Sequence, residues 1–159
     1  MRSAVRKLIP IGTHALAIGV GFALGIYLLP ILIAPESPGV EAVRSTADIA
    51  RFKGIFRRDL ADSDVFHWGE GNLFIGPDNI AFEGRLAPGP DYRLYLSPKF
   101  VETETDFESL KSEMVQVGFV QTFENFMVAV PESVDPGEFN AAIVWCESFG
   151  QFITAATYQ

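Results

Sequence analysis

The sequence predicts an all-β domain, an antiparallel β-sandwich or a barrel-like sheet, that follows a single N-terminal transmembrane helix. Residues 8–34 contain no Asp, Glu, Lys or Arg, whereas residues 52–159 consist of short apolar or alternating segments separated by turn residues. About 20 apolar residues suffice to cross a bilayer, and short strands between turns are typical of sandwiches and barrels. The predicted organisation is therefore a cytoplasmic tip and membrane helix (1–34), a linker with a short helix (35–51) and a β domain (52–159).

The charges on either side of the apolar segment predict its orientation. Arg2, Arg6 and Lys7 precede it, and Glu36 and Glu41 follow it. Cytoplasmic flanks favour Lys and Arg, so we expect the N-terminus inside and everything after the helix outside. The predicted location is the cytoplasmic (plasma) membrane, with a single pass and a periplasmic or extracellular domain.

Two further features of the apolar segment bear on its role. A cleaved signal peptide usually has a shorter apolar stretch, about 7–15 residues, and an Ala-x-Ala-like end. Here the bulky Leu32 stands two residues before Ala34, which favours an uncleaved anchor. Ala17, Gly21 and Gly25 recur every four residues, and such a small-residue stripe would let a second helix pack closely as a homodimer.

The elements after the membrane segment follow from turn residues and periodicity. Residues 35–39 form a Pro- and Gly-containing linker, and a brief helix is expected at 45–51 with Ser45 or Thr46 as its cap. Residues 106–113 would add one or two helical turns. The predicted strands are residues 52–56, 71–75, 79–82, 92–96, 115–120, 123–130, 141–147 and 152–157.

The charge of the exported part excludes one class of partner. Residues 35–159 hold nine basic and all 20 acidic residues, hence a net charge of −11. Such a surface repels nucleic-acid phosphates and anionic lipids and suits a cationic partner. We therefore expect no nucleic-acid binding.

Motifs for catalysis and metal binding are largely missing. There is no phosphate-binding loop, and a structural zinc site would need four ligands where residues 35–159 offer Cys146 and His67 as the only Cys and His. Asp59, Asp62 and Asp64 lack the glycine and glutamate of a calcium loop. We expect no metal site, and nothing beyond a lone cysteine favours an enzyme.

Cys146 is the single cysteine, so no intramolecular disulfide is available to it. Side chains alternate along a strand. If the even-numbered residues of 143–149 face the interior, Cys146 is a small buried hydrophobe; if the odd-numbered ones do, it faces outward or into a cleft. Reactivity would need a nearby cation to lower the thiol pKa, and His67 and Arg93 are the candidates.

From residue 52 to the C-terminus the chain carries a series of ordered landmarks, which are residues 52–56 (FKGIF), 67–71 (HWGEG), 89–97 (GPDYRLYLS), 130–131 (VP), 134–136 (VDP) and 143–146 (IVWC). In this order they resemble the landmarks of a known domain, the DM-thirteen family. The Gly-Pro-Asp and Trp-Cys pieces are the most specific. Two departures stand out: Asn125-Phe126-Met127 replace a usual Gln and Tyr, and Phe152 is offset from the usual aromatic position after Phe149.

The resemblance implies an all-β, membrane-tethered or extracellular domain with a role in electron transfer; in animals the family accompanies haem-binding DOMON domains. It implies Cys146 as a redox thiol, with His67, Asp91, Tyr95 and Trp145 as cofactor-binding residues and haem as the candidate group. The implied partner is an unidentified redox or envelope protein. The alternative is a non-catalytic cell-envelope interaction module in which Cys146 is a core residue.

Overall fold

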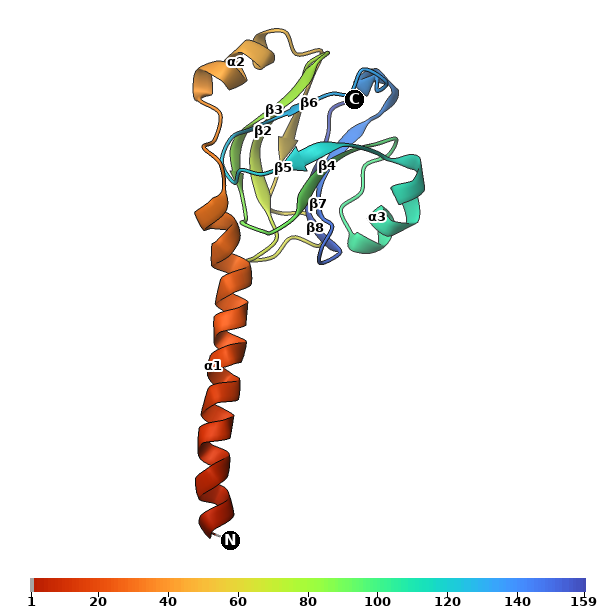
Figure 1. Ribbon diagram of the computed structural model, residues 1–159. Coiled ribbons are helices and arrows are strands. Elements are labelled where there is room, and N and C mark those ends of the chain that lie inside the picture. Colours follow the sequence, from red (N-terminus) through yellow and green to blue (C-terminus); the bar gives the residue numbers. More distant parts are fainter. Residues whose placement is uncertain (1) are drawn as a thin grey trace.

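The computed structural model describes residues 2–159, with side chains from residue 9 onward, and shows a β-sandwich above a long N-terminal helix (Figure 1). Two antiparallel sheets of four strands face each other. The predicted sandwich is confirmed, and within the described residues the sheets do not close into a barrel. The elements are α1 (Arg2–Ile33), α2 (Val40–Asp48), β1 (Phe52–Phe56), β2 (Gly69–Ile75), β3 (Asn79–Leu86), β4 (Tyr92–Ser97), α3 (Glu104–Leu110), η1 (Lys111–Glu113), β5 (Val115–Val120), β6 (Phe126–Ala129), η2 (Pro136–Glu138), β7 (Ala141–Cys146) and β8 (Gln151–Thr157).

The strand order joins segments that are distant in the sequence. The first sheet runs β1-β2-β3-β6 and the second β5-β4-β7-β8. In the second sheet, β4 lies between β5 and β7, which places Tyr92 opposite Cys146. The end of β7 and the start of β4 therefore lie at the same end of the sandwich.

The core fills the space between the sheets, and a second apolar layer lies outside the second sheet. Leu94 and Val144 face the first sheet, in the interior cluster. Ile143 and Trp145 face the other way, into a cluster that includes Phe107 of α3. All six residues of β7 are buried because both faces of this strand are covered.

Two short helices differ in position from the sequence expectation. α2 begins at Val40 after Gly39, with no side-chain cap, so the prediction of Ser45 or Thr46 as the cap was wrong. Ser45 lies inside the helix, and its hydroxyl donates to the Ala42 carbonyl. α3 begins two residues early because Thr103 accepts a hydrogen bond from the Asp106 amide and caps it.

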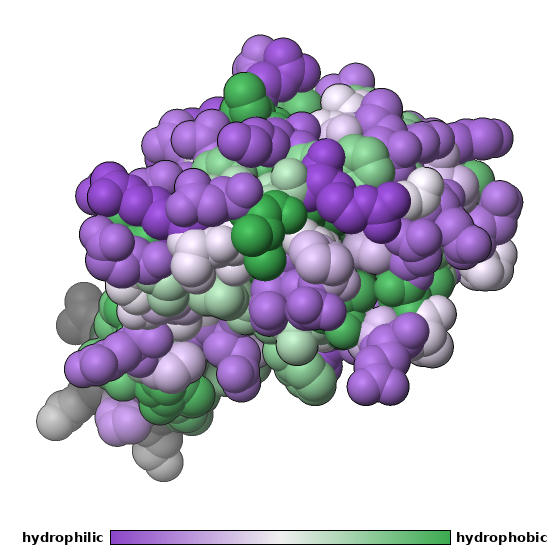
Figure 2. All heavy atoms as spheres, turned by 90° about the horizontal axis from the view of Figure 1, so that it is seen from above, coloured by the Kyte–Doolittle hydropathy of each residue, from purple (hydrophilic) through white to green (hydrophobic). Residues whose placement is uncertain are grey.

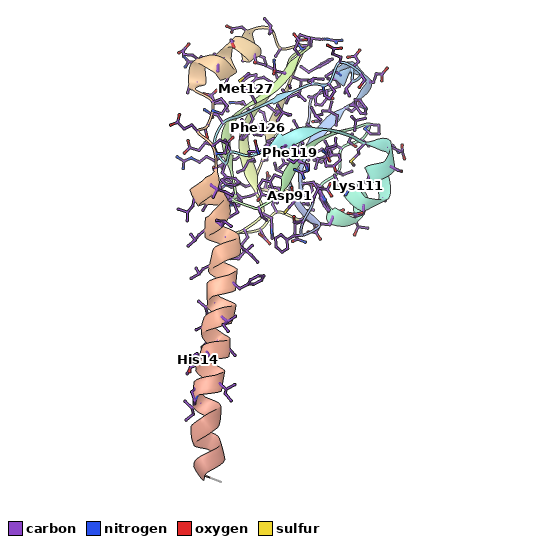
Figure 3. All side chains as sticks on the ribbon, in the orientation of Figure 1. His14, Asp91, Lys111, Phe119, Phe126 and Met127 are labelled. Atoms are coloured by element: carbon purple, nitrogen blue, oxygen red, sulfur yellow. The ribbon has the colours of Figure 1, made fainter. Side chains whose placement is uncertain are left out.

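α1 is long and apolar around its whole circumference. Its segment Ile9–Ile33 has the length and composition to cross a membrane. Most of α1 projects freely below the sandwich, and its last turns lie beside it (Figure 1). His14 lies on the free part (Figure 3), where its ring nitrogen lies 2.7 Å from the Pro10 carbonyl oxygen.

Candidate functional site

Three connections meet at the end of the sandwich nearest the free part of α1. They are residues 57–68 between β1 and β2, 87–91 between β3 and β4, and 147–150 between β7 and β8. We call this end the foot of the sandwich. The last turns of α1 run past it (Figure 1).

A cavity of about 550 Å³ lies between the foot and α1, and we call it the basal cavity. Ala23, Ile26 and Tyr27 of α1 form one wall, while residues of the three foot connections and of β4, β7 and β8 form the rest. Apolar side chains dominate this lining, and its size is that of a small-molecule site. The side chains with polar atoms are those of Tyr27, His67, Tyr92, Cys146 and Gln151.

Cys146 is the last residue of β7 and lines the basal cavity. Its side chain is 3% exposed and belongs to the interior cluster of the sandwich. Burial raises the pKa of the thiol, and the backbone N–H groups of Phe149, Asp91 and Ser148 offset this only in part. The negative charge of Asp91 acts in the same direction as burial, so the thiol stays protonated at neutral pH.

His67 reaches the same cavity from the connection between β1 and β2, where Asp64 holds it in place. Asp64 Oδ1 accepts the backbone N–H groups of Phe66 at 2.6 Å and His67 at 2.8 Å. Asp64 Oδ2 lies 3.0 Å from His67 Nδ1. Burial acts to raise the pKa of Asp64, but these hydrogen bonds outweigh it and the pKa is below its usual value. With Nδ1 donating to Asp64, Nε2 of a neutral imidazole remains as an acceptor.

Tyr92 completes the group of polar side chains around Cys146. It begins β4, pairs with Cys146 across the sheet and is 3% exposed. Its ring packs edge-on against Phe123 with centroids 6.0 Å apart. Burial raises the pKa of Tyr92, with smaller contributions from Cys146 and Tyr27, and no hydrogen bond to its hydroxyl occurs within residues 9–159. Tyr92 also lines the basal cavity, so its hydroxyl is a ready hydrogen-bonding group for a ligand there.

The structure brings together two of the five predicted site residues, Cys146 and His67. Asp91 lies close by but outside the basal cavity. Its carboxylate binds Arg93 Nη2 at 2.8 Å and accepts a hydrogen bond from the Ser148 hydroxyl at 2.9 Å. Arg93 also stacks over Phe119, with its guanidinium carbon 3.6 Å from the ring centroid. Its positive charge is therefore paired with the Asp91 carboxylate and does not lower the pKa of the Cys146 thiol.

Tyr95 and Trp145 lie on the opposite face of the second sheet, away from Cys146. Trp145 stacks on Phe107 with ring centroids 3.9 Å apart. The Tyr95 hydroxyl donates to Glu147, and Lys111 Nζ lies 3.0 Å from the same carboxylate. Figure 3 shows Lys111 beside α3 and Asp91 on the sandwich at about the same height. These two aromatics cannot contact a ligand that also contacts Cys146, because the sheet lies between them.

Sequence reasoning missed Tyr27, Asp64 as an orienting group, and Tyr92. The spacing of Asp64 and His67, three residues apart in a turn, was a signal for their contact. Nothing in the sequence indicated that Tyr92 would face Cys146, because that neighbourhood depends on strand pairing between residues 54 positions apart.

The residues of the basal cavity do not fit a haem. Its candidate axial ligands are His67, the tyrosines of the lining and a buried thiol with a raised pKa, and a thiolate is the form of cysteine that ligates iron. Burial also raises the pKa of Tyr92, which disfavours the phenolate that would bind iron. None of the lining residues is Lys or Arg, so the cavity offers no cation for haem propionates. Among the described residues there is also no group of three or more His, Cys, Asp or Glu side chains placed to hold a metal ion.

Fold and site together define a β-sandwich domain that follows an apolar N-terminal helix and has a ligand-sized cavity beside one buried thiol. The family model described as electron transfer DM13 matches residues 56–158, which is most of the chain. The chain belongs to this DM13 (DM-thirteen) electron-transfer family, as the landmarks in its sequence predicted. No curated protein and no solved structure matches the chain in the corresponding comparisons.

Proposed function

We propose that this chain is a single-pass, membrane-anchored accessory domain for electron transfer that lies outside the cytoplasm and works through its basal cavity. The observation that carries the proposal is the convergence of His67, Tyr92 and Cys146 on one apolar cavity in a domain of an electron-transfer family. Such a cavity suits a bound redox group that exchanges electrons with a partner protein.

The chemistry of Cys146 supports a bound group over direct thiol exchange. Two-electron thiol oxidation to an intramolecular disulfide needs a second thiol, and Cys146 is the single cysteine of the chain. The raised pKa leaves little thiolate to attack another molecule. The thiol therefore acts as a polarizable wall of the cavity that contacts the bound group.

The membrane placement is supported by α1. Its apolar segment is almost entirely exposed in the described chain, which is unfavourable in water and favourable in lipid. Arg2, Arg6 and Lys7 before the segment and Glu36 after it favour the N-terminus inside. Protease treatment of right-side-out membrane vesicles should digest the sandwich. Protection of the sandwich, or release of a chain that lacks residues 1–34, would contradict the anchor.

The decisive experiment is a redox titration of the full chain purified from the membranes of its own cell, followed by reduced-minus-oxidised absorbance. We expect a reversible bound group that is released on unfolding. Cys146→Val, which replaces the sulfur with a slightly larger apolar side chain, should change its occupancy or midpoint potential. Ile143→Val, an equally conservative change on the outer face of β7, should leave both unchanged.

The burial of Cys146 favours one other function, a non-catalytic envelope interaction module with the thiol as packing. It predicts a purified chain without any redox group and a Cys146→Val variant that behaves as the wild type in every assay except stability. The homodimer through Ala17, Gly21 and Gly25 stays a prediction. Cβ atoms added at the two glycines would meet nothing within 4 Å in a single chain, so the stripe is open.

A further inference from the structure

We infer that the basal cavity takes its ligand from the lipid bilayer, and that this ligand is a lipid-soluble carrier of the quinone class. The inference rests on the proposed function, since it names the ligand of the same cavity. Three features carry it: the depth of the cavity along α1, the apolar rim around it, and the hydrogen-bonding side chains in its lining.

The position along α1 places the cavity at the membrane surface. A hydrocarbon core of roughly 30 Å corresponds to about 20 helical residues. Counted from Ile9, where the apolar segment begins, such a span ends near Leu28. The cavity wall contributed by Ala23, Ile26 and Tyr27 therefore lies at the level of the outer leaflet, and the foot of the sandwich lies beside it.

The foot also presents large apolar side chains to its surroundings. Val65 is 80% exposed, Phe66 61% and Phe149 52%, and they come from two separate connections at the same end of the sandwich. Seen from above, the opposite end carries mainly hydrophilic residues (Figure 2). Exposed apolar side chains around a membrane helix are stable when they enter the interface. Because Phe66 and Phe149 also line the cavity, its mouth opens toward lipid.

The chemistry of the cavity then selects a class of lipid-soluble ligand. A fatty acid or phospholipid head would need a cation for its charge, and no Lys or Arg lines the cavity. A quinone is neutral, and its ring carries carbonyl oxygens that accept hydrogen bonds. Tyr92, a buried residue that lines the cavity, carries a hydroxyl that can donate such a bond. His67, held by Asp64, presents Nε2 as an acceptor, which can take a hydrogen bond from a hydroxyl of the reduced quinol form. A quinone is also redox-active, as an electron-transfer domain requires.

Photoaffinity labelling tests the inference on the full chain in nanodiscs of zwitterionic lipid. The probe is an azido-benzoquinone with a decyl tail, and the labelled positions are mapped by mass spectrometry. We expect label on the foot connections and on α1 around residues 23–27. Unlabelled decyl-benzoquinone should compete with it, whereas decylbenzene, which has the same tail without the carbonyls, should not.

Two pairs of variants sharpen the test. Ala23→Phe places a large side chain into the cavity from α1 and should reduce cavity labelling at least about tenfold. Ala23 is exposed and lies outside the sandwich, so the substitution should not disturb the sandwich fold. Ala15→Phe, on the free part of α1, should leave it unchanged. Tyr92→Phe should weaken competition by decyl-benzoquinone roughly 2- to 10-fold, the range for one lost hydrogen bond. Tyr95→Phe, on the other face of the sheet, should not.

Label spread along α1 without competition, or equal labelling of Ala23→Phe and wild type, would overturn the quinone assignment. If labelling fails in this way but the purified chain still carries a reversible redox group, the proposed electron-transfer role stands. The ligand of the cavity then belongs to another chemical class. If both the redox group and the labelling are missing, the proposed function fails as well.

Discussion

At the scale of single residues, the environment of Cys146 decides its chemistry. The two interpretations from the sequence assumed that one face of its strand was buried and the other was not. In the structure both faces are buried, so the thiol is shielded although it also lines a cavity. Burial, together with the nearby charge of Asp91, outweighs the amides that would stabilise a thiolate. Cys146 is therefore a contact residue and a poor nucleophile.

This environment predicts slow reaction of the native thiol with an alkylating reagent. We expect Cys146 in the folded chain to react about 100-fold more slowly than in the unfolded chain, which corresponds to an opening free energy of about 2.7 kcal/mol. The measurement is mass-spectrometric labelling with a maleimide, with and without denaturant. The matched control is Val65→Cys in a Cys146→Ala background, an exposed thiol that should react at the same rate in both states. Equal rates for native and unfolded Cys146 would mean a reactive thiol.

The carboxylate next to Cys146 in the sequence predicts a pH dependence. Burial acts to raise the pKa of Glu147, but hydrogen bonds from Tyr95 and Lys111 and the charges of Lys111 and Arg93 bring it below its usual value. A depressed carboxylate pKa contributes stability above the unfolded pKa, and this contribution is lost as the pH falls through the folded pKa.

Glu147→Gln should therefore lower the free energy of unfolding by about 1 kcal/mol at pH 7. The difference from the wild type should shrink as the pH falls below the ordinary glutamate pKa of 4.5. Urea unfolding at pH 7 and at low pH measures both values. Glu108→Gln, an exposed carboxylate on α3, should show no such pH-dependent difference. A constant difference at all pH values would contradict the linkage.

At the scale of elements, α3 turns the second sheet into a buried layer. Its Phe107 is fully buried between the stacked ring of Trp145 and the edge-on ring of Tyr95. The Thr103 cap begins the helix at the position that directs Phe107 onto the sheet. The outer face of β7 is thereby removed from solvent, and Tyr95 and Trp145 are occupied in packing.

Phe107→Ala should consequently reduce the free energy of unfolding by about 3–5 kcal/mol, the usual range for deleting a buried aromatic side chain. Denaturant unfolding followed by tryptophan fluorescence measures this, because Trp145 contacts the deleted ring. Ile55→Ala serves as the control, since that side chain is 61% exposed, and should change the stability by less than about 1 kcal/mol. A similar loss in both variants would mean that α3 adds little to the sheet.

At the scale of the whole molecule, the two ends of the sandwich differ in polarity. The foot carries Val65, Phe66 and Phe149 beside the apolar helix, and the opposite end is mainly hydrophilic (Figure 2). The net charge of −11 on residues 35–159 gives no attraction to anionic headgroups. The proposed contact of the foot with the membrane would therefore be apolar and should persist at high salt.

This polarity predicts a difference between two labelled positions. An environment-sensitive fluorophore is attached to Val65→Cys in a Cys146→Ala background. Its emission maximum should shift to the blue for the folded chain in lipid vesicles, relative to the unfolded chain without detergent. The same dye on Glu132→Cys, at the opposite end, should report water in both cases. The shift at residue 65 should be insensitive to salt between low and molar concentrations. A water-like spectrum at residue 65 would place the foot away from the bilayer.

Much of the architecture could be predicted because it depends on local patterns. The alternation and turn residues of 52–159 predicted the strands within a few residues, and the charge-free segment before Glu36 predicted α1. The departures have local causes as well. The strand predicted at 123–130 is only Phe126–Ala129, because Thr122 and Asn125 form a turn in which the Thr122 hydroxyl donates to the Asn125 carbonyl.

By itself the sequence determined an apolar helix, a set of short strands, an acidic domain, and a lone thiol in an ordered family pattern. Only the tertiary structure decided which residues share the site. It placed Tyr92 and His67 with Cys146 on one side of the second sheet, and Tyr95 and Trp145 on the other. The physical reason is that neighbours across a sheet depend on pairing between distant strands, and the burial of a face depends on what covers it; neither is encoded in a local pattern.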